Sequence, residues 1–298
     1  MIVQGTLSEL LAPGLNEVFN TAMNEAPSVW ESLFNSNTSN RAWEEDISWT
    51  GFEPFQEYGE LEDIDLRGVA QGPKTRYVHR KWGLGYQISQ EAIDDNLYGT
   101  TTEFPAQLAR AYRATKETIA ATVFNTGFTT FVGADTKALF ATDHTLYGPA
   151  GGTQANTFGT TRALSHTALK DAMINMKRNK ADDNIFSPVT PAILLVPDQL
   201  EFTAREILQT TGMPYSADNT INAIQNSLQI VTWSYLTDTN DWFLLAPKAQ
   251  TKLKYWDRWS LKHVMKDNED NQSMRHLSYA RFSFGFSHWA GTYGVQGA

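Results

Sequence analysis

The sequence contains no cysteine and no apolar stretch of 18 residues. The first absence excludes disulfide bonds, thiolate metal sites and cysteine nucleophiles together. The second leaves no segment long enough for a transmembrane helix. The N-terminal residues also lack the basic and then apolar pattern of a signal peptide. We therefore expect a protein that is made and used in a soluble compartment, without contact with a membrane.

Charged residues are scarce as well, at 19% against roughly 25% in an average soluble domain. The 24 basic and 33 acidic side chains give a net charge of −9, and no basic stripe is visible. Specific nucleic-acid binding depends on clustered Lys and Arg that neutralise phosphates. The composition therefore argues against a protein that binds nucleic acid strongly.

Sequence motifs of common enzyme chemistry are also missing. There is no GxSxG nucleophile elbow, no GxGxxG or GxxxxGK[ST] phosphate loop, and no HExxH zinc site. Aromatic residues are abundant instead, with nine Trp and sixteen Phe. Such a composition fits a large core, and it fits equally a surface that is buried against partners.

Residues 43–88 predict a long hairpin. Two extended arms surround a polar tip, and the returning arm runs from Thr75 to Ile88, with apolar residues alternating from Trp82 onward. A bare two-stranded ribbon is only marginally stable in water, so we expect this hairpin to lie on a partner surface. The acidic residues of its tip could bind a cation or meet a basic patch on a neighbour. They are Glu60, Glu62, Asp63 and Asp65.

Helices alternate with strands in the rest of the chain, which indicates an α+β class. The longest helix is predicted over 103–126, after Thr102 as its cap and before Gly127 as its stop. Ser165 is the predicted cap of a second helix, and Asp198 with Glu201 is the predicted capping box of a third. The apolar run 191–197 between them is typical of a buried strand, and four further strands are expected after residue 228.

Only a few residues suggest chemistry. His144 beside Asp143 could act as a base or a metal ligand, but a catalytic site also needs a nucleophile and an orienting group. We therefore favour a structural hydrogen-bonding role for His144. Asp94 and Asp95 could be acid/base carboxylates, yet they follow Ser89, a predicted N-cap, and the helix dipole favours acids there.

The order of the segments resembles that of the Mu-like bacteriophage major head subunits. The resemblance rests on "KWGLGYQISQEAIDDNLYG" (81–99), the long helix, "KALFATDHTLYG" (137–148) and the opening "MIVQGTLSELL". It implies the HK97-type capsid fold with an N-terminal arm, an E-loop hairpin, a P-domain with a spine helix, and an α/β A-domain. The implied parts are 1–45 for the arm, 46–86 for the E-loop, 87–150 for the P-domain with spine helix 103–126, 151–251 for the A-domain, and 252–298 for C-terminal strands that return to both domains.

The resemblance also implies a structural function without enzymatic activity, cofactor or metal. Pentamers and hexamers of the chain would form an icosahedral head around double-stranded DNA, in a virion assembled in the bacterial cytoplasm. Portal, scaffolding and decoration proteins would be further partners, and since the arm begins near Met1, we expect any scaffold to be a separate protein or the chain to be mature. The residues expected at contacts between subunits are Glu60, Glu62, Asp63, Asp65, Arg67, Lys74, Arg76 and Trp82.

Two alternatives stay open at this point. An encapsulin-type compartment shell has the same implied fold but encloses cargo enzymes, and a hydrolase that uses His144 belongs to another class. Covalent crosslinking, which some relatives form from a hairpin lysine, is not expected, because nothing marks an Asn partner for Lys74 or Lys81.

Overall fold

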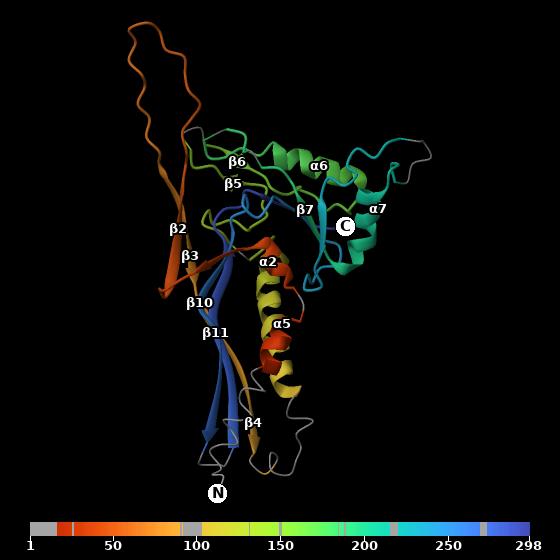
Figure 1. Ribbon diagram of the computed structural model, residues 1–298. Coiled ribbons are helices and arrows are strands. Elements are labelled where there is room, and N and C mark those ends of the chain that lie inside the picture. Colours follow the sequence, from red (N-terminus) through yellow and green to blue (C-terminus); the bar gives the residue numbers. More distant parts are fainter. Residues whose placement is uncertain are drawn as a thin grey trace.

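The computed structural model consists of a long sheet with a helix alongside it, an α/β layer at one end, and a hairpin that projects away from both (Figure 1). It describes residues 17–25, 27–89, 91, 103–130, 132–148, 151–183, 185–187, 189–214, 220–268 and 273–298. Thr102, the predicted cap of the long helix, lies outside these residues, and so do Asp94 and Asp95, which the sequence places in the first turns of a helix after Ser89. Within the described part, no helix combines the length and the apolar character that crossing a membrane requires.

The long sheet has four strands in the order β1-β10-β11-β4. β1 runs parallel to β10, and the other pairs are antiparallel. The strands are β1 (Asn35–Thr38), β10 (Leu253–Asn268), β11 (Ser273–Phe286) and β4 (Arg80–Ser89). One face of β11 is apolar, since Ala280, Phe282, Phe284 and Phe286 are all buried.

The returning arm of the predicted hairpin is divided between two sheets, which corrects the sequence prediction. β3 (Gln71–Val78) pairs with β2 (Trp43–Trp49), but β4 pairs with β11 of the long sheet. The change of partner occurs at His79, which lies between the two strands and whose ring nitrogens bond the hydroxyls of Ser283 (3.0 Å) and Ser39 (3.2 Å). The hairpin therefore ends at residue 78, and Trp82 belongs to the long sheet.

Close approach explains one glycine of β4. A Cβ on Gly85 would lie 2.6 Å from the backbone oxygen of His276 in β11, closer than real Cβ contacts. This glycine therefore lets β4 pack closely against the backbone of β11 in its own chain. Ser89, the predicted N-cap, is the last residue of β4, and residues 92–100 lie outside the description.

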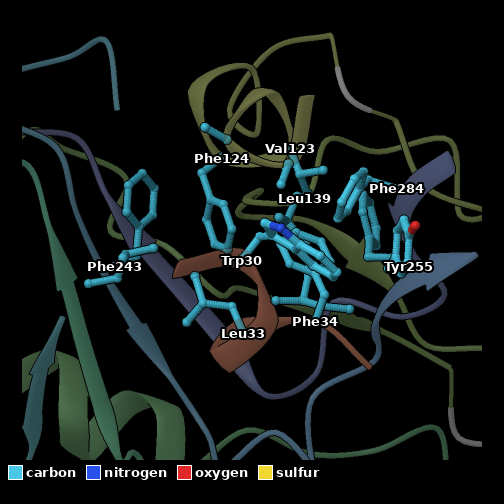
Figure 2. Packing of buried hydrophobic residues seen from close by; sticks show 14 of the residues in the cluster. Trp30, Leu33, Phe34, Val123, Phe124, Leu139, Phe243, Tyr255 and Phe284 are labelled. Atoms are coloured by element: carbon cyan, nitrogen blue, oxygen red, sulfur yellow. The ribbon is translucent and has the colours of Figure 1, made fainter. Parts of the chain in front are cut away.

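Helix α5 (Glu103–Asn125) confirms the predicted long helix and packs against β11. Its buried side chains meet the short helix α2 (Val29–Leu33), the long sheet and the α/β layer in one aromatic-rich core, part of which is drawn in Figure 2. Phe124 contacts Phe34, Trp233 and Phe243 in edge-on geometry, with ring centroids 5.3–6.1 Å apart. The abundant aromatics therefore do fill a core, although others stay on the surface.

The α/β layer has a second four-stranded sheet in the order β12-β9-β7-β8. Its elements are α6 (His166–Lys177), β7 (Ile193–Val196), the 3₁₀ helix η1 (Asp198–Leu200), α7 (Glu201–Gln209), β8 (Gln229–Thr232), β9 (Trp242–Leu245) and β12 (Thr292–Val295). Ser165 caps α6, because its hydroxyl accepts a bond from the N–H of Ala168 (3.2 Å). The predicted capping box at Asp198 is wrong: Asp198 lies inside η1, and neither η1 nor α7 has a side-chain cap.

A buried carboxylate joins the parts of the molecule. Glu117 of α5 accepts hydrogen bonds from the N–H of Val29 at the start of α2 (2.9 Å) and from Nε1 of Trp233 beyond β8 (2.7 Å). Burial raises the pKa of Glu117, and the hydrogen bonds it accepts oppose that rise. The carboxylate therefore ties the N-terminal segment and the α/β layer to the long helix.

We predict that Glu117→Ala lowers the free energy of unfolding by about 3 kcal/mol, because it leaves two buried donors without an acceptor. Glu117→Gln should cost about 1 kcal/mol, since the two donors bond different carboxylate oxygens and the Gln amide replaces one of these oxygens with an NH2 group. Denaturant titration of the full chain measures both. Glu103→Ala, at an exposed position of the same helix, is the control, and an equal loss there would contradict the argument.

A second prediction concerns pH. His276 is fully buried, its ring stacks on Tyr86 (4.5 Å between centroids), and neither nitrogen has a hydrogen-bond partner among the described residues. Burial, together with the nearby His263, lowers the pKa of His276 to about 4. The unfolded chain thus binds the proton more tightly, so stability should fall by about 2 kcal/mol as pH drops from 6.5 to 4.

Unfolding measured over that pH range tests this prediction. His276→Phe keeps a stacking ring without a titrating group, so its stability should depend less on pH than that of the unchanged chain. Equal slopes for the two chains would refute the assignment to His276.

Candidate functional site

The hairpin has one face turned toward its own chain. Tyr77 of β3 bonds Ser287 through their hydroxyls (2.6 Å), and Lys254 of β10 pairs with Asp46 of β2 (2.5 Å). Burial acts to raise the pKa of Asp46, but the hydrogen bonds from Lys254 and Ser287 outweigh it and hold that pKa below its usual range. These contacts fix the paired strands β2 and β3, here called the stem, to the end of the long sheet where β10 begins and β11 ends.

The opposite face of the stem is uncovered and carries several large apolar side chains among charged ones. Trp43, Ile47 and Trp49 of β2 alternate with half-buried residues, and Val78 lies directly across from Trp43. All four side chains are exposed, Trp49 by 63%. The Arg76 guanidinium lies 4.0 Å from the centre of the Trp43 ring. Exposed large hydrophobics gathered on one ribbon face indicate a surface that is covered by a partner.

The tip of the hairpin, residues 50–70, has no regular strand or helix. Thr50 and Ala70 close its base, because the N–H of each bonds an oxygen of the other (3.1 and 3.0 Å). Beyond this base the apolar side chains extend into solvent, with Phe55 and Leu61 fully exposed. Figure 1 shows the tip as a loop far from the body of the molecule. The tip therefore has almost no core of its own.

The polar contacts within the tip are few. Glu62 accepts a bond from the N–H of Gly59 (2.7 Å), and Arg67 pairs with Asp65 (2.8 Å) and with Glu53. Six carboxylates against one arginine give residues 50–70 a formal charge of 1 − 6 = −5. Among the described residues, no cluster of three His, Asp or Glu side chains could hold a metal ion. The distinguishing chemical feature of this loop is therefore its net negative charge, rather than a cation site.

The residues predicted from sequence to contact neighbours fall in three places. The five charged residues of the tip lie together and are exposed, and Lys74 and Arg76 lie on the open face of β3. Trp82 lies apart from them on β4, half-buried, with its ring stacked on Phe282 (6.0 Å). The tip residues are Glu60, Glu62, Asp63, Asp65 and Arg67.

The charge-based prediction overlooked the apolar residues of the tip. They recur at every third position from Phe52 to Ile64, in a segment that contains Pro54, Gly51 and Gly59. A period of three belongs neither to an α-helix nor to a strand, so a search for those two periods passes over it. The exposed set is Phe52, Phe55, Tyr58, Leu61, Ile64 and Leu66.

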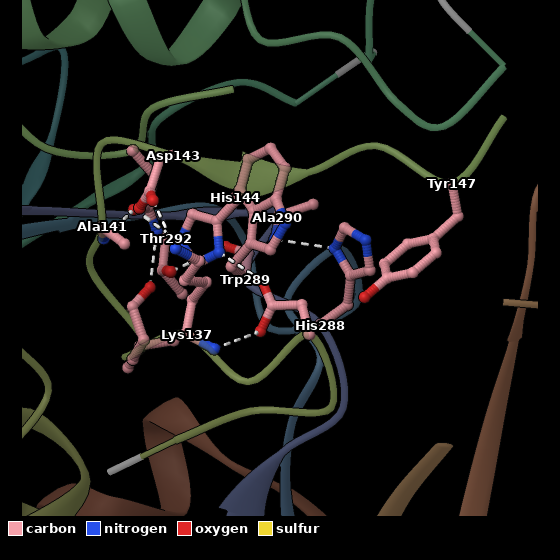
Figure 3. Close-up of polar contacts among 12 residues, drawn as sticks. Lys137, Ala141, Asp143, His144, Tyr147, His288, Trp289, Ala290 and Thr292 are labelled. Carbon is pink, nitrogen blue, oxygen red and sulfur yellow. Dashed lines mark hydrogen bonds and ion pairs between the residues drawn. The ribbon is translucent and has the colours of Figure 1, made fainter. Parts of the chain in front are cut away.

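His144, the candidate for chemistry, has no access to solvent. Its side chain is 0% exposed, Nδ1 bonds Oδ2 of Asp135 (2.5 Å), and Nε2 bonds Oδ1 of Asn156 (3.0 Å). The imidazole stacks on Trp289, as Figure 3 shows, with 4.8 Å between ring centroids. The neighbouring Asp143 turns to Lys137, whose ammonium lowers the pKa of that carboxyl. The preferred structural role of His144 is consistent with this network, which leaves no room for a substrate.

Comparisons with solved structures identify the architecture as the HK97-type capsid fold. The procapsid of bacteriophage JBD30 is 16% identical with a TM-score of 0.56, over 100% of this chain and 77% of that one. The capsid protein of the cyanophage P-SCSP1u is 11% identical with a TM-score of 0.61, over 91% and 88%. A virus-like particle from Pyrococcus furiosus is 8% identical with a TM-score of 0.53, over 95% and 98%.

Sequence comparison gives the family. A search of curated proteins found no significant match. The sequence profile described as "Phage capsid protein" does match, over residues 72–295, which include nearly all of β3, and β4, the spine helix α5 and the whole α/β layer. The chain therefore belongs to the phage capsid protein family.

Proposed function

We propose that the protein is the major capsid protein of a tailed bacteriophage, which self-assembles as pentamers and hexamers into an icosahedral head around double-stranded DNA. The observation that carries this proposal is the hairpin, whose open stem face and tip present apolar side chains that its own chain does not cover. Family membership supports a structural role in the virion. Assembly would take place in the host bacterial cytoplasm.

The energetic argument follows from burial. Covering a large apolar side chain contributes about 2 kcal/mol, and the tip alone exposes six such side chains. In a monomer these side chains stay in water and contribute no free energy of burial, whereas in a shell every subunit would bury them in the same contact. Repetition makes individually modest contacts cooperative, because each subunit is held through several neighbours at once. The hairpin is therefore best explained as an arm that reaches a second copy.

The proposed contacts between subunits keep the residues predicted from sequence and add the apolar ones. The charged residues of the tip, with Lys74 and Arg76 on the stem, would set the register of the contact, and the apolar residues of the tip would supply most of its free energy. The proposed parts of the chain keep their predicted boundaries, except that the E-loop ends at residue 78.

Other partners belong to the same proposal. Portal, scaffolding and decoration proteins would join the shell, and the packaged DNA would be contacted non-specifically. The net charge of −9 fits a shell that encloses DNA without attracting it strongly to the wall. The ordered motifs from residue 81 to 148 favour a kinship with the Mu-like head subunits.

A cargo-holding compartment shell is the second candidate, because the virus-like particle from Pyrococcus furiosus has a similar fold. The two candidates differ in what the shell encloses. Electron microscopy of particles from the native source, with nucleic-acid extraction, separates them: heads filled with double-stranded DNA and bearing a portal favour the phage, and shells filled with protein favour the compartment.

We predict that the triple variant Phe55→Ser/Leu61→Ser/Leu66→Ser abolishes shell assembly and leaves the fold of the subunit intact. These side chains are 94–103% exposed, so their loss costs the isolated chain little. In an assembled shell, it would remove about 2 kcal/mol for each buried side chain. Negative-stain microscopy and size-exclusion chromatography measure assembly, and circular dichroism with thermal melting measures the fold.

Gln56→Ser, an exposed polar position of the same tip, is the matched control and should assemble normally. Normal shells from the triple variant would contradict the proposal, because the uncovered apolar residues would then serve no contact.

A further inference from the structure

The long sheet has a second face, opposite to the one that packs against helix α5 (Figure 1). Side chains of β11 alternate between the two faces: Ala280 and Phe282 are buried in the core beside α5, whereas Tyr279 and Arg281 lie on the other side. Pairing with β10 and β4 extends this second face over three strands, and we call it the open sheet face. Because every second residue of a strand reaches one face, such a surface is not visible as a stripe in the sequence.

The strand register gives the composition of the open sheet face. Its four rows, each read from β4 through β11 to β10, are Lys81, Arg281 and Trp259; Gly83, Tyr279 and Lys262; Gly85, Leu277 and Val264; and Gln87, Arg275 and Lys266. Five of these twelve positions are basic and none is acidic, and Arg258, in the bulge before Trp259, adds a sixth cation. In a chain with a net charge of −9, this face is a marked separation of charge.

The cations of the open sheet face are not neutralised by their own chain. Among the described residues, none of the six forms an ion pair. Two pairs of like charge lie directly opposite each other, Lys81 with Arg281 and Arg275 with Lys266, and such pairs destabilise a sheet. Charges of both signs would keep the face soluble equally well. A face of one sign therefore needs another explanation.

The first row forms a cluster of cations around Trp259. Nζ of Lys81 lies 5.4 Å from the centre of the ring, and the guanidinium carbons of Arg281 and Arg258 lie 5.6 and 6.0 Å from it. Two backbone oxygens accept hydrogen bonds from Arg281 (3.2 and 3.4 Å), which position its guanidinium without neutralising it. Nε of Arg258 is buried and has no hydrogen-bond partner in the described part of the chain. This cluster therefore attracts an anionic group.

The layout fits a linear polyanion better than a single small anion. Cations recur from the first row to the last, over about 20 Å at roughly 3.4 Å for each residue. Tyr279 is exposed and Trp259 is half-buried among these cations. Aromatic side chains between basic ones are typical of surfaces that bind nucleic-acid strands, and they favour a nucleic acid over an acidic protein segment. Gly83 and Gly85 carry no side chain, so a strand can approach the sheet closely on the β4 side.

We propose that the open sheet face binds the phosphate backbone of nucleic acid without sequence preference. Phosphate groups pair with the cations of the first and last rows, and this pairing relieves the repulsion between the directly opposed like charges. The inference rests on the proposed function for the source of the nucleic acid, which is the packaged DNA, and it names the surface of contact. The binding itself needs no assembled shell.

Fluorescence anisotropy of the full chain with a labelled DNA duplex at low salt tests the proposal. Lys81→Gln/Lys262→Gln/Lys266→Gln should weaken binding by about tenfold or more, because three phosphate contacts lose their charge. The slope of log K against the logarithm of the salt concentration should also decrease in size by about 1 for each lysine. The variant should melt no earlier than the unchanged chain, since the substitutions at Lys81 and Lys266 remove like-charge pairs. Lys262→Gln alone serves if the triple variant melts early.

The matched control removes the same charge elsewhere. Lys170→Gln/Lys177→Gln/Arg178→Gln changes exposed positions of helix α6 and its C-cap, and it should bind DNA as the unchanged chain does. An equal loss in this control would overturn the proposal, because binding would then follow net charge alone. Unchanged affinity and salt slope in the sheet variant would overturn it as well.

Two further measurements identify the ligand and separate the inference from the proposed function. Single-stranded DNA that binds as tightly as the duplex supports the phosphate backbone as the ligand, whereas tighter binding of poly-glutamate would overturn the nucleic acid and assign the face to an acidic protein. Electron microscopy follows shell assembly independently. Shells from a chain that does not bind DNA would overturn only this inference, and DNA binding by a chain that forms no shells would overturn only the proposed function.

Discussion

Glu117 accepts one hydrogen bond from the N-terminal segment and one from the α/β layer. These two hydrogen bonds join both parts to the long helix, and together they form the body to which the hairpin is attached. The carboxylate is 8% exposed, so each donor that it satisfies would otherwise be a buried group without a partner. The aromatic core fills the space between the long helix, the N-terminal segment and the α/β layer. The two hydrogen bonds of the carboxylate fix how these parts align. A body assembled in this way can hold the stem at a constant angle, which a reaching arm needs if every subunit is to meet its neighbour alike.

The stem and the tip of the hairpin differ in how firmly they are attached to the rest of the chain. The inner face of the stem is tied to the long sheet through Tyr77 and Asp46, and it therefore inherits the rigidity of the body. The tip lacks such ties, and its free apolar side chains cost solubility unless its acidic residues offset them. The six carboxylates thus have two uses in a single chain. They place charge beside the exposed apolar side chains of the tip, and in the proposed assembly they would set the register of the contact between subunits.

Sequence reasoning predicted much of this architecture because the relevant signals are local. The spine helix, the buried strand at 193–196 and the Ser165 cap each depend on residues a few positions apart. The division at His79 was missed because residues 75–82 contain no Gly or Pro that would mark a break, and only the distant Ser39 and Ser283 show where the strand changes partner. The junction at Glu117 and Trp233, 116 residues apart, left no local pattern. The charged residues of the tip were predicted as contact residues because charges are easy to recognise in a sequence. The apolar residues of the tip were not predicted, because their period of three matches neither a helix nor a strand.

The weakness of the tip as an independent structure is consistent with its proposed use. A segment that becomes ordered only on its partner loses conformational entropy in binding, which lowers the affinity gained for each buried side chain. Low affinity at a single contact lets misplaced subunits dissociate before a shell closes, whereas a preformed, tightly binding arm would trap errors. Many such contacts in a closed shell then add to a stable particle. The body is fixed by buried hydrogen bonds, and the tip has almost none. In the proposed assembly, this difference would let incorrectly placed subunits dissociate early and would still give a stable closed shell.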